Sequence, residues 1–208
     1  MASARNAGTE TRVVRAEKNQ YLAVRDTLAD AFAEDPILAW LLSHRGNTRK
    51  ARQHLFGRGV RSSLRRGVVE ITEDGSAAAL WWPPGTASIG GVREVLEGLL
   101  ELWGSWRALG SGLGRAGRFY EDMLRMRPAE PHWYLAAIGT RPETRQRGAG
   151  SALLAERLAA CDAEHHPAYL ECSNANNLAF YERHGFQAGE QCTLDGSPPF
   201  WPMSRAAR

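Results

Sequence analysis

Two segments in the C-terminal half carry residue types that could bind a phosphate and move protons. In the first, Arg145, Gly148 and Gly150 lie where a strand-like apolar run gives way to a helical pattern. The N–H groups at a helix start and the positive end of its dipole favour phosphate oxygens. Glycine lets a pyrophosphate approach the backbone closely. We therefore expect an anion-binding loop here, although the same glycines alone are also compatible with a simple tight turn.

The second segment, residues 169–186, reads YLECSNANNLAFYERHGF and combines a carboxylate, a pair of asparagines and a tyrosine. Together the two segments resemble the Gcn5-related N-acetyltransferase (GNAT) family, whose members move an acyl group from acyl-coenzyme A to an amine. The family signature is Arg/Gln-x-x-Gly-x-Gly/Ala after the fourth strand, then Asn after the fifth, then Phe-Tyr or Leu-Tyr and Gly-Phe. The matching residues are Arg145, Gly148, Gly150, Asn174, Tyr181 and Gly185-Phe186.

This resemblance implies that acetyl-CoA is the acyl donor and that no metal takes part. Backbone groups of Ile138, Gly139 and Thr140 would meet the pantetheine arm. The side chains of Asn174 and Asn177 would contact coenzyme A, and Arg145 would add charge. The pyrophosphate would be held by backbone N–H groups of Gln146, Arg147, Gly148, Ala149, Gly150 and Ser151.

The same resemblance assigns Tyr181 as the acid that protonates the departing thiolate. A phenol with a pKa of about 10 stays protonated at neutral pH and can donate to sulfur of pKa about 8.5. Without the resemblance, an ordinary half-buried aromatic would be the better interpretation, and Asn174 could equally be a helix cap. The amine must also lose a proton, and Glu171 is the first candidate base, with a solvated or salt-bridged role as an equal alternative. Weaker candidates are His132, Glu34 and Asp35.

The acceptor is left open by the sequence. Stretches such as TLADAFAEDP, AALWWPPG and the ending WPMSR resemble an antibiotic-resistance branch of the family. A small-molecule antibiotic, a polyamine or a protein N-terminus would each fit. Direct attack in a ternary complex is expected, because no cysteine lies where a covalent nucleophile would be needed, and a homodimer is compatible with the family. The alternative function is a catalytically silent acyl-CoA sensor or structural module on the same fold.

The composition of the chain narrows the classes of function and location that remain open. The 208 residues include 26 basic and 23 acidic side chains, which gives a net charge of only +3. Nucleic-acid binding usually needs a dense basic stripe, so this weak positive charge does not favour it. No apolar run reaches the roughly 18 residues of a membrane span, so no membrane is expected. The three cysteines form no Cys-x-x-Cys pair, and we expect reduced thiols in a cytoplasmic protein. The adjacent histidines at 165 and 166 are better explained as solvated loop residues than as metal ligands.

The elements that must position these residues suggest one α/β domain of the GNAT type over residues 11–208. We expect a central, mostly antiparallel sheet, splayed at the two strands after Pro131, with helices on both faces. Residues 1–10 are expected to be a flexible tail, and residues 89–127 a helical insertion. Expected strands are 12–16, 68–72, 77–82, 132–139, 168–172, 190–194 and 200–205. Expected helices are 21–33, 37–42, 48–66, 92–109, 118–127, 148–163 and 176–184.

Overall fold

The computed structural model describes residues 11–44, 46–86 and 113–208. Its centre is a seven-stranded sheet in the order β1-β2-β3-β4-β5-β7-β6. Neighbouring strands are antiparallel except for β4 and β5, which are parallel. The strands are β1 (Val13–Arg15), β2 (Val68–Thr72), β3 (Ala77–Trp82), β4 (Trp133–Thr140), β5 (Ala168–Cys172), β6 (Gln187–Ala188) and β7 (Trp201–Arg205).

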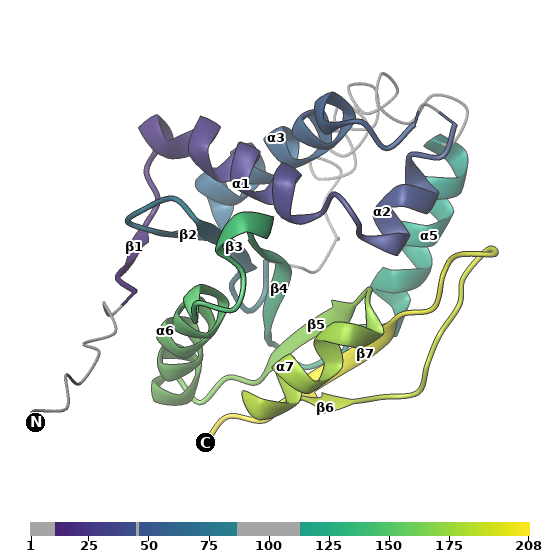
Figure 1. Ribbon diagram of the computed structural model, residues 1–208. Helices are drawn as coiled ribbons and strands as arrows, with labels where there is room; N and C mark the ends of the chain where they lie inside the picture. The colour runs from purple at the N-terminus through teal and green to yellow at the C-terminus, as the bar shows by residue number, and fades with distance from the viewer. Residues whose placement is uncertain (1–10, 45, 87–112) are drawn as a thin grey trace, which may run out of the picture.

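Helices cover both faces of the sheet, as expected (Figure 1). The alternation of β3 decides what each face packs: Ala78 and Leu80 join the cluster beneath α1 and α3, whereas Ala79 and Trp81 join the cluster beneath α6. The helices are α1 (Tyr21–Ala31), α2 (Pro36–Leu41), α3 (Arg49–Arg66), α5 (Leu113–Met126), α6 (Ala149–Ala163) and α7 (Leu178–Arg183). Short 3-10 turns are η1 (Lys18–Gln20), η3 (Pro142–Thr144) and η4 (Ala175–Asn177).

The sheet splays between β4 and β5. These two strands pair only at Trp133 with Ala168 and at Tyr134 with Tyr169. Beyond Tyr134, β4 remains paired to β3 while its other edge has no strand partner among the described residues. The expected splay is therefore confirmed, and it leaves backbone N–H and C=O groups of β4 available on that edge.

A third, smaller apolar cluster joins α2, α5 and the segment before β7. Ile37, Phe119 and Phe200 are its buried members, and the rings of Phe119 and Phe200 lie 5.7 Å apart, edge to face. Helix α5 begins at Leu113 rather than at 118, so Gly114 and Gly117 lie inside a helix. This cluster holds the C-terminal end of α5 against the sheet, where Arg127 reaches the functional site.

The final strand pair differs from the prediction. Residues 187 and 188, not 190–194, pair with β7, and Cys192 makes one isolated bridge to Phe200. In that bridge's register the neighbouring partners would be Pro198 and Pro202, which have no N–H to donate, so the ladder cannot extend. The helix expected over 92–109 and the tail expected over 1–10 lie outside the described residues. No helix in the described ranges has both the length and the apolarity needed to cross a membrane.

Candidate active site

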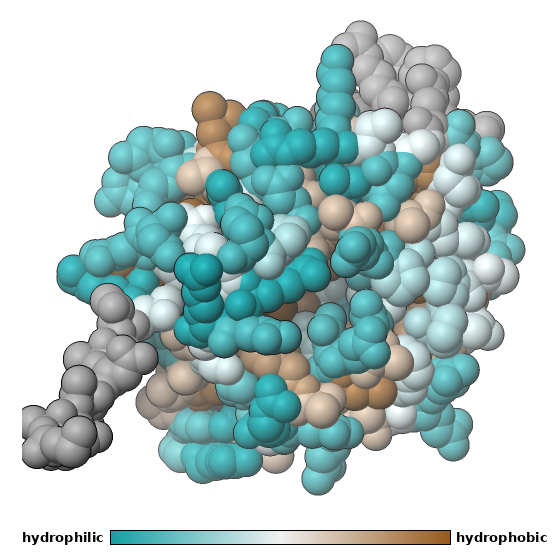
Figure 2. Space-filling model, viewed as in Figure 1, coloured by the Kyte–Doolittle hydropathy of each residue, from teal (hydrophilic) through white to brown (hydrophobic). Residues whose placement is uncertain are grey.

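A cavity of about 760 Å³ opens where β4 and β5 diverge. Its walls come from the end of α1, the loop before α2, β4, the start of α6, β5 and α7. Figure 2 shows a mostly hydrophilic face with apolar side chains at the bottom of a central recess. The predicted residues that line the cavity are Ile138, Thr140, Arg145, Gln146, Gly148, Ala149, Gly150, Ser151, Glu171, Asn174, Asn177 and Tyr181. Gly139 and Arg147 were predicted for the site and are not among the lining residues.

The loop before α6 has the backbone of an anion-binding turn. Gly148 adopts φ +86°, a left-handed conformation that side chains rarely adopt, and Gln146 is also left-handed at φ +65°. No side chain caps the start of α6, so the first N–H groups of the helix keep their hydrogen-bonding capacity. Gln146 in a sparsely populated conformation is a feature that clusters at ligand-binding sites.

Gly150 lines the cavity, and its lack of a side chain also matters for packing. A Cβ atom at this position would lie 3.3 Å from the ring of Phe180. The glycine therefore allows α7 to pack closely against the start of α6. This contact fixes Tyr181, the next residue of α7, relative to the loop before α6.

The side chains of Arg145 and Arg147, the two arginines of this loop, point in different directions. Arg145 donates a hydrogen bond of 3.0 Å to the carbonyl of Ala31, at the end of α1, and lies 3.6 Å from the carboxylate of Glu34. Arg147 is exposed and reaches the carbonyl of Glu143 at 3.4 Å. Arg145 therefore brings positive charge to the cavity wall, whereas Arg147 contributes only its backbone to the turn.

Gly139 faces away from the cavity, toward α1. A Cβ atom there would come within 2.5 Å of the side chain of Ala31 and 3.3 Å of Phe32. Its lack of a side chain lets α1 lie directly on β4, while Ile138 and Thr140 line the cavity instead. Gly139 can still contribute backbone groups along the unpaired edge of β4.

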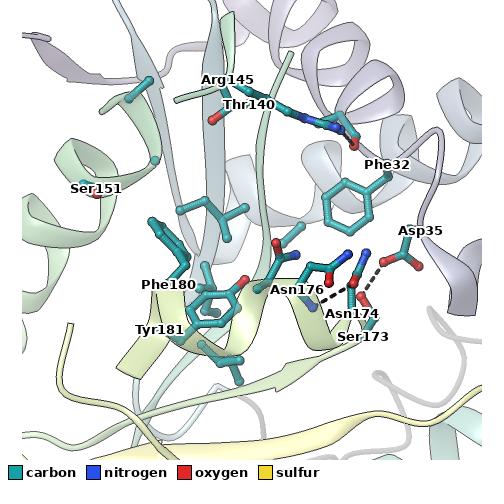
Figure 3. A pocket seen from close by; sticks show the side chains of 18 of the residues that line it. Phe32, Asp35, Thr140, Arg145, Ser151, Ser173, Asn174, Asn176, Phe180 and Tyr181 are labelled. Atoms are coloured by element: carbon teal, nitrogen blue, oxygen red, sulfur yellow. Dashed lines mark hydrogen bonds between the residues drawn. The ribbon is translucent and has the colours of Figure 1, made fainter. Parts of the chain in front are cut away.

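Tyr181 lies on α7 with 9% of its surface exposed, between Phe180 and Phe186. Its hydroxyl points toward the middle of the cavity (Figure 3). Burial raises the pKa of Tyr181 above its usual value, and the nearby Cys172 thiol and Asp35 carboxylate raise it further. The phenol is therefore a proton donor rather than a phenolate at neutral pH.

Asn174 caps the short turn η4, because its side chain accepts a hydrogen bond of 3.0 Å from the backbone N–H of Asn176. The capping alternative left open by the sequence is thus observed. Asn174 also lines the cavity, as does Asn177 one turn later. The amide nitrogen of Asn174 keeps its two donors for other partners.

Glu171 belongs to a buried polar cluster. Its carboxylate accepts a hydrogen bond of 3.2 Å from Arg127, and both side chains are only 6% exposed. The guanidinium also lies 3.5 Å from the ring centroid of Tyr134, whose hydroxyl approaches the same carboxylate. Burial raises the pKa of Glu171, and the charge of Arg127 opposes that rise. The salt-bridged interpretation is therefore observed, although Glu171 also lines the cavity.

Asp35 reaches the same end of the cavity from the loop before α2. One carboxylate oxygen accepts a hydrogen bond of 2.8 Å from the N–H of Leu38 and so caps α2. The other oxygen accepts a short hydrogen bond from the hydroxyl of Ser173 (Figure 3). Burial raises the pKa of Asp35, and the hydrogen bonds from Ser173 and from the backbone N–H of Leu38 oppose that rise. Asp35 was among the weaker candidates from sequence, and Ser173 was missed. The signal for Ser173 was its position two residues after Glu171, on the same face of the extended chain.

Of the other weaker candidates, Glu34 lines the cavity and His132 does not. His132 is buried, shares a hydrogen bond of 2.7 Å with the carbonyl of Glu130 through Nδ1, and packs edge-on against Tyr169. The side chain of Glu34 is 84% exposed. Among the described residues no cluster of three or more His, Cys, Asp or Glu side chains is placed to hold a metal ion.

Comparison with known proteins agrees with this geometry. Residues 103–186 match the model of the Acetyltransferase (GNAT) family. An uncharacterized N-acetyltransferase of Schizosaccharomyces pombe is 27% identical over 184 residues, covering 83% of this chain and 72% of that protein.

Solved structures share the fold across nearly the whole chain. A Corynebacterium glutamicum protein described as a histone acetyltransferase and related acetyltransferase has a TM-score of 0.69 at 20% identity, with 95% and 97% of the two chains covered. Arylalkylamine N-acetyltransferase 2 of Aedes aegypti has a TM-score of 0.66 at 14% identity, covering 96% and 100%. Agmatine N-acetyltransferase has a TM-score of 0.61 at 18% identity, covering 94% and 98%. The solved structures show that the fold is of the GNAT type. The family match and the N-acetyltransferase relative confirm the predicted enzyme class, an N-acetyltransferase.

Proposed function

We propose that the protein transfers an acetyl group from acetyl-CoA to a primary amine, by direct attack of the amine in a ternary complex. The observation that carries this proposal is the continuous cavity joining the uncapped start of α6, the free edge of β4 and the hydroxyl of Tyr181. Each of the three is a part that an acyl-CoA-dependent transfer needs.

The residues present fit acetyl-CoA. The N–H groups of the loop around Gly148 would hold the pyrophosphate, and the unpaired edge of β4 near Ile138 would pair with the pantetheine arm. Asn174 and Asn177 offer amide groups on the opposite wall. When bound, acetyl-CoA supplies the thioester whose carbonyl carbon is attacked.

Tyr181 donates its proton to the sulfur as the carbon–sulfur bond breaks. A main-chain N–H of β4 near Ala137 or Ile138 would stabilise the developing charge on the carbonyl oxygen. The three cysteines are free, and none is among the residues that line the cavity. Burial raises the pKa of Cys161 to about 12 and also raises that of Cys172, so both are thiols rather than nucleophilic thiolates. This supports direct attack over a covalent acyl-enzyme.

The base that takes the amine proton is one of two carboxylates. Glu171, the first candidate from the sequence, is already neutralised by Arg127. Asp35 accepts hydrogen bonds from uncharged donors among the described residues, burial raises its pKa, and its charge acts on Tyr181. We therefore favour Asp35 as the base, with Ser173 orienting it, and retain Glu171 as the alternative.

The acceptor belongs to the small amines or aminoacyl amides. The sequence stretches named above resemble puromycin N-acetyltransferase, an antibiotic-resistance enzyme, and the structural neighbours include enzymes named for agmatine and arylalkylamines. The first test is release of free thiol from acetyl-CoA against a panel containing puromycin, agmatine and tyramine.

The decisive variant is Tyr181→Phe, which removes one oxygen and preserves packing against Phe180. We expect coenzyme A affinity to be unchanged and the single-turnover rate to fall by about 10²–10⁴-fold, the usual contribution of general acid catalysis. Full single-turnover activity would show that another group protonates the sulfur. Coenzyme A binding by the wild-type protein, with no transfer to any amine, would favour the alternative function, an acyl-CoA sensor.

A further inference from the structure

The cavity carries opposite charge at its two ends. The positive end of the α6 dipole opens into one end of the cavity, and the basic residues Arg145 and Arg183 also line the cavity. Arg183 follows Phe180 by three residues, on the same side of α7, and Phe180 contacts Gly150 at the start of α6. This basic end suits the phosphates of coenzyme A.

The other end is acidic. Asp35 and Glu171 line it, and Ser173, two residues after Glu171 and just beyond the end of β5, donates a hydrogen bond to Asp35. A two-residue step along a strand spans about 6.6 Å, so both carboxylates act on the same small volume. The amine must enter this end, because the hydroxyl of Tyr181 and the free edge of β4 place the thioester between the two ends.

The cation paired with Glu171 is not presented to the acceptor. Arg127 lies behind Glu171 under the ring of Tyr134, is 6% exposed and is absent from the described lining of the cavity. It neutralises Glu171, whereas the hydrogen-bond donors to Asp35 among the described residues, the hydroxyl of Ser173 and the N–H of Leu38, carry no charge. An alkylammonium ion entering the cavity brings a positive charge to Asp35, and so becomes bound beside the group to which it gives its proton.

We infer that this acidic end selects amines with no carboxylate beside the amino group, and rejects free amino acids. The inference rests on the proposed function. A carboxylate on the acceptor would bring a second negative charge next to Asp35, and the hydroxyl of Ser173 is already donated to Asp35. A like charge about 5 Å away, at an effective dielectric constant of about 20, shifts an equilibrium by roughly two orders of magnitude. The substrate class is thus the products of amino-acid decarboxylation, together with aminoacyl amides.

The test compares phenylalanine amide with phenylalanine, which have nearly the same shape and differ by one charge. Phenethylamine, which lacks the group altogether, is the third acceptor. Values of kcat/KM are taken over a range of pH and referred to the deprotonated amine, so that the different amine pKa values cancel. We expect the amide and phenethylamine to exceed the free acid by about 100-fold or more.

The variant Asp35→Asn removes the charge and keeps the acceptor oxygen that caps α2. Whatever its absolute rate, the ratio of amide to acid should fall by at least about tenfold, a change that a purely structural role would not produce. Acid and amide reacting within about threefold of each other in the wild type would overturn the inference. A preference for the free acid would overturn it too, and would indicate that Arg127 binds carboxylates. No transfer to any of the three or to the amine panel, with coenzyme A bound, would instead refute the proposed function.

Discussion

Variants of the Arg127–Glu171 pair can distinguish a structural role of Glu171 from a catalytic one. Both side chains are 6% exposed, so removing one charge leaves the other buried without a counterion. Breaking a buried pair in this way costs about 3–5 kcal/mol in the free energy of unfolding. We therefore expect Glu171→Gln alone to be strongly destabilised, and its loss of activity to be uninformative.

The double variant Arg127→Met with Glu171→Gln removes both charges together. Replacing a buried pair by uncharged groups of similar volume is often close to neutral, so its stability should return to within about 1–2 kcal/mol of wild type. Urea unfolding of wild type, both single variants and the double variant measures this recovery. The stable double variant then reports on the chemical role of the Glu171 carboxylate.

Activity is measured as the single-turnover rate with acetyl-CoA saturating. If Asp35 is the base, the single-turnover rate of Asp35→Asn should fall by about 10²–10⁴-fold. The rate of the double variant should then be at least about tenfold higher than that of Asp35→Asn. A folded double variant that loses 10²–10⁴-fold, beside an Asp35→Asn variant that remains active, would refute our assignment. It would establish Glu171, the candidate that the sequence favoured, as the base.

Two further predictions concern binding and stability. Gly148→Asp should weaken coenzyme A binding severely, because it places a side chain and a negative charge beside the pyrophosphate at a left-handed backbone position (φ +86°); unchanged affinity by calorimetry in a folded variant would remove the loop from the site. Hydrogen bonds from Arg205 lower the pKa of Asp162 to about 2, so its stabilisation is present above its unfolded pKa and is lost as pH falls from about 4 toward 2. Asp162→Asn should therefore lower the melting temperature at pH 7 and flatten its dependence on pH between 4 and 2; parallel curves for variant and wild type would contradict this.

Local patterns in the sequence were sufficient for most of the scaffold. The Asp-Gly turn between two β-prone runs predicted the β2–β3 hairpin at its observed bounds, because turn and strand chemistry are both local. The glycines around 148 predicted the turn before α6 because a left-handed conformation favours glycine. The prediction failed where a strand depends on the segment that it must pair with. Residues 190–194 are such a case, because prolines on the opposite segment stop the strand pairing.

The arrangement of charge at the site was decided by tertiary structure. Arg127 meets Glu171 and Asp35 meets Ser173 across separations of 44 and 138 residues, and no local pattern encodes such contacts. The sequence by itself determined that a carboxylate, a tyrosine and a glycine-containing turn before a helix were present. Only folding decided which carboxylate is paired with a cation and which is held by uncharged donors among the described residues, because pKa and charge balance depend on burial and on neighbours brought from distant parts of the chain.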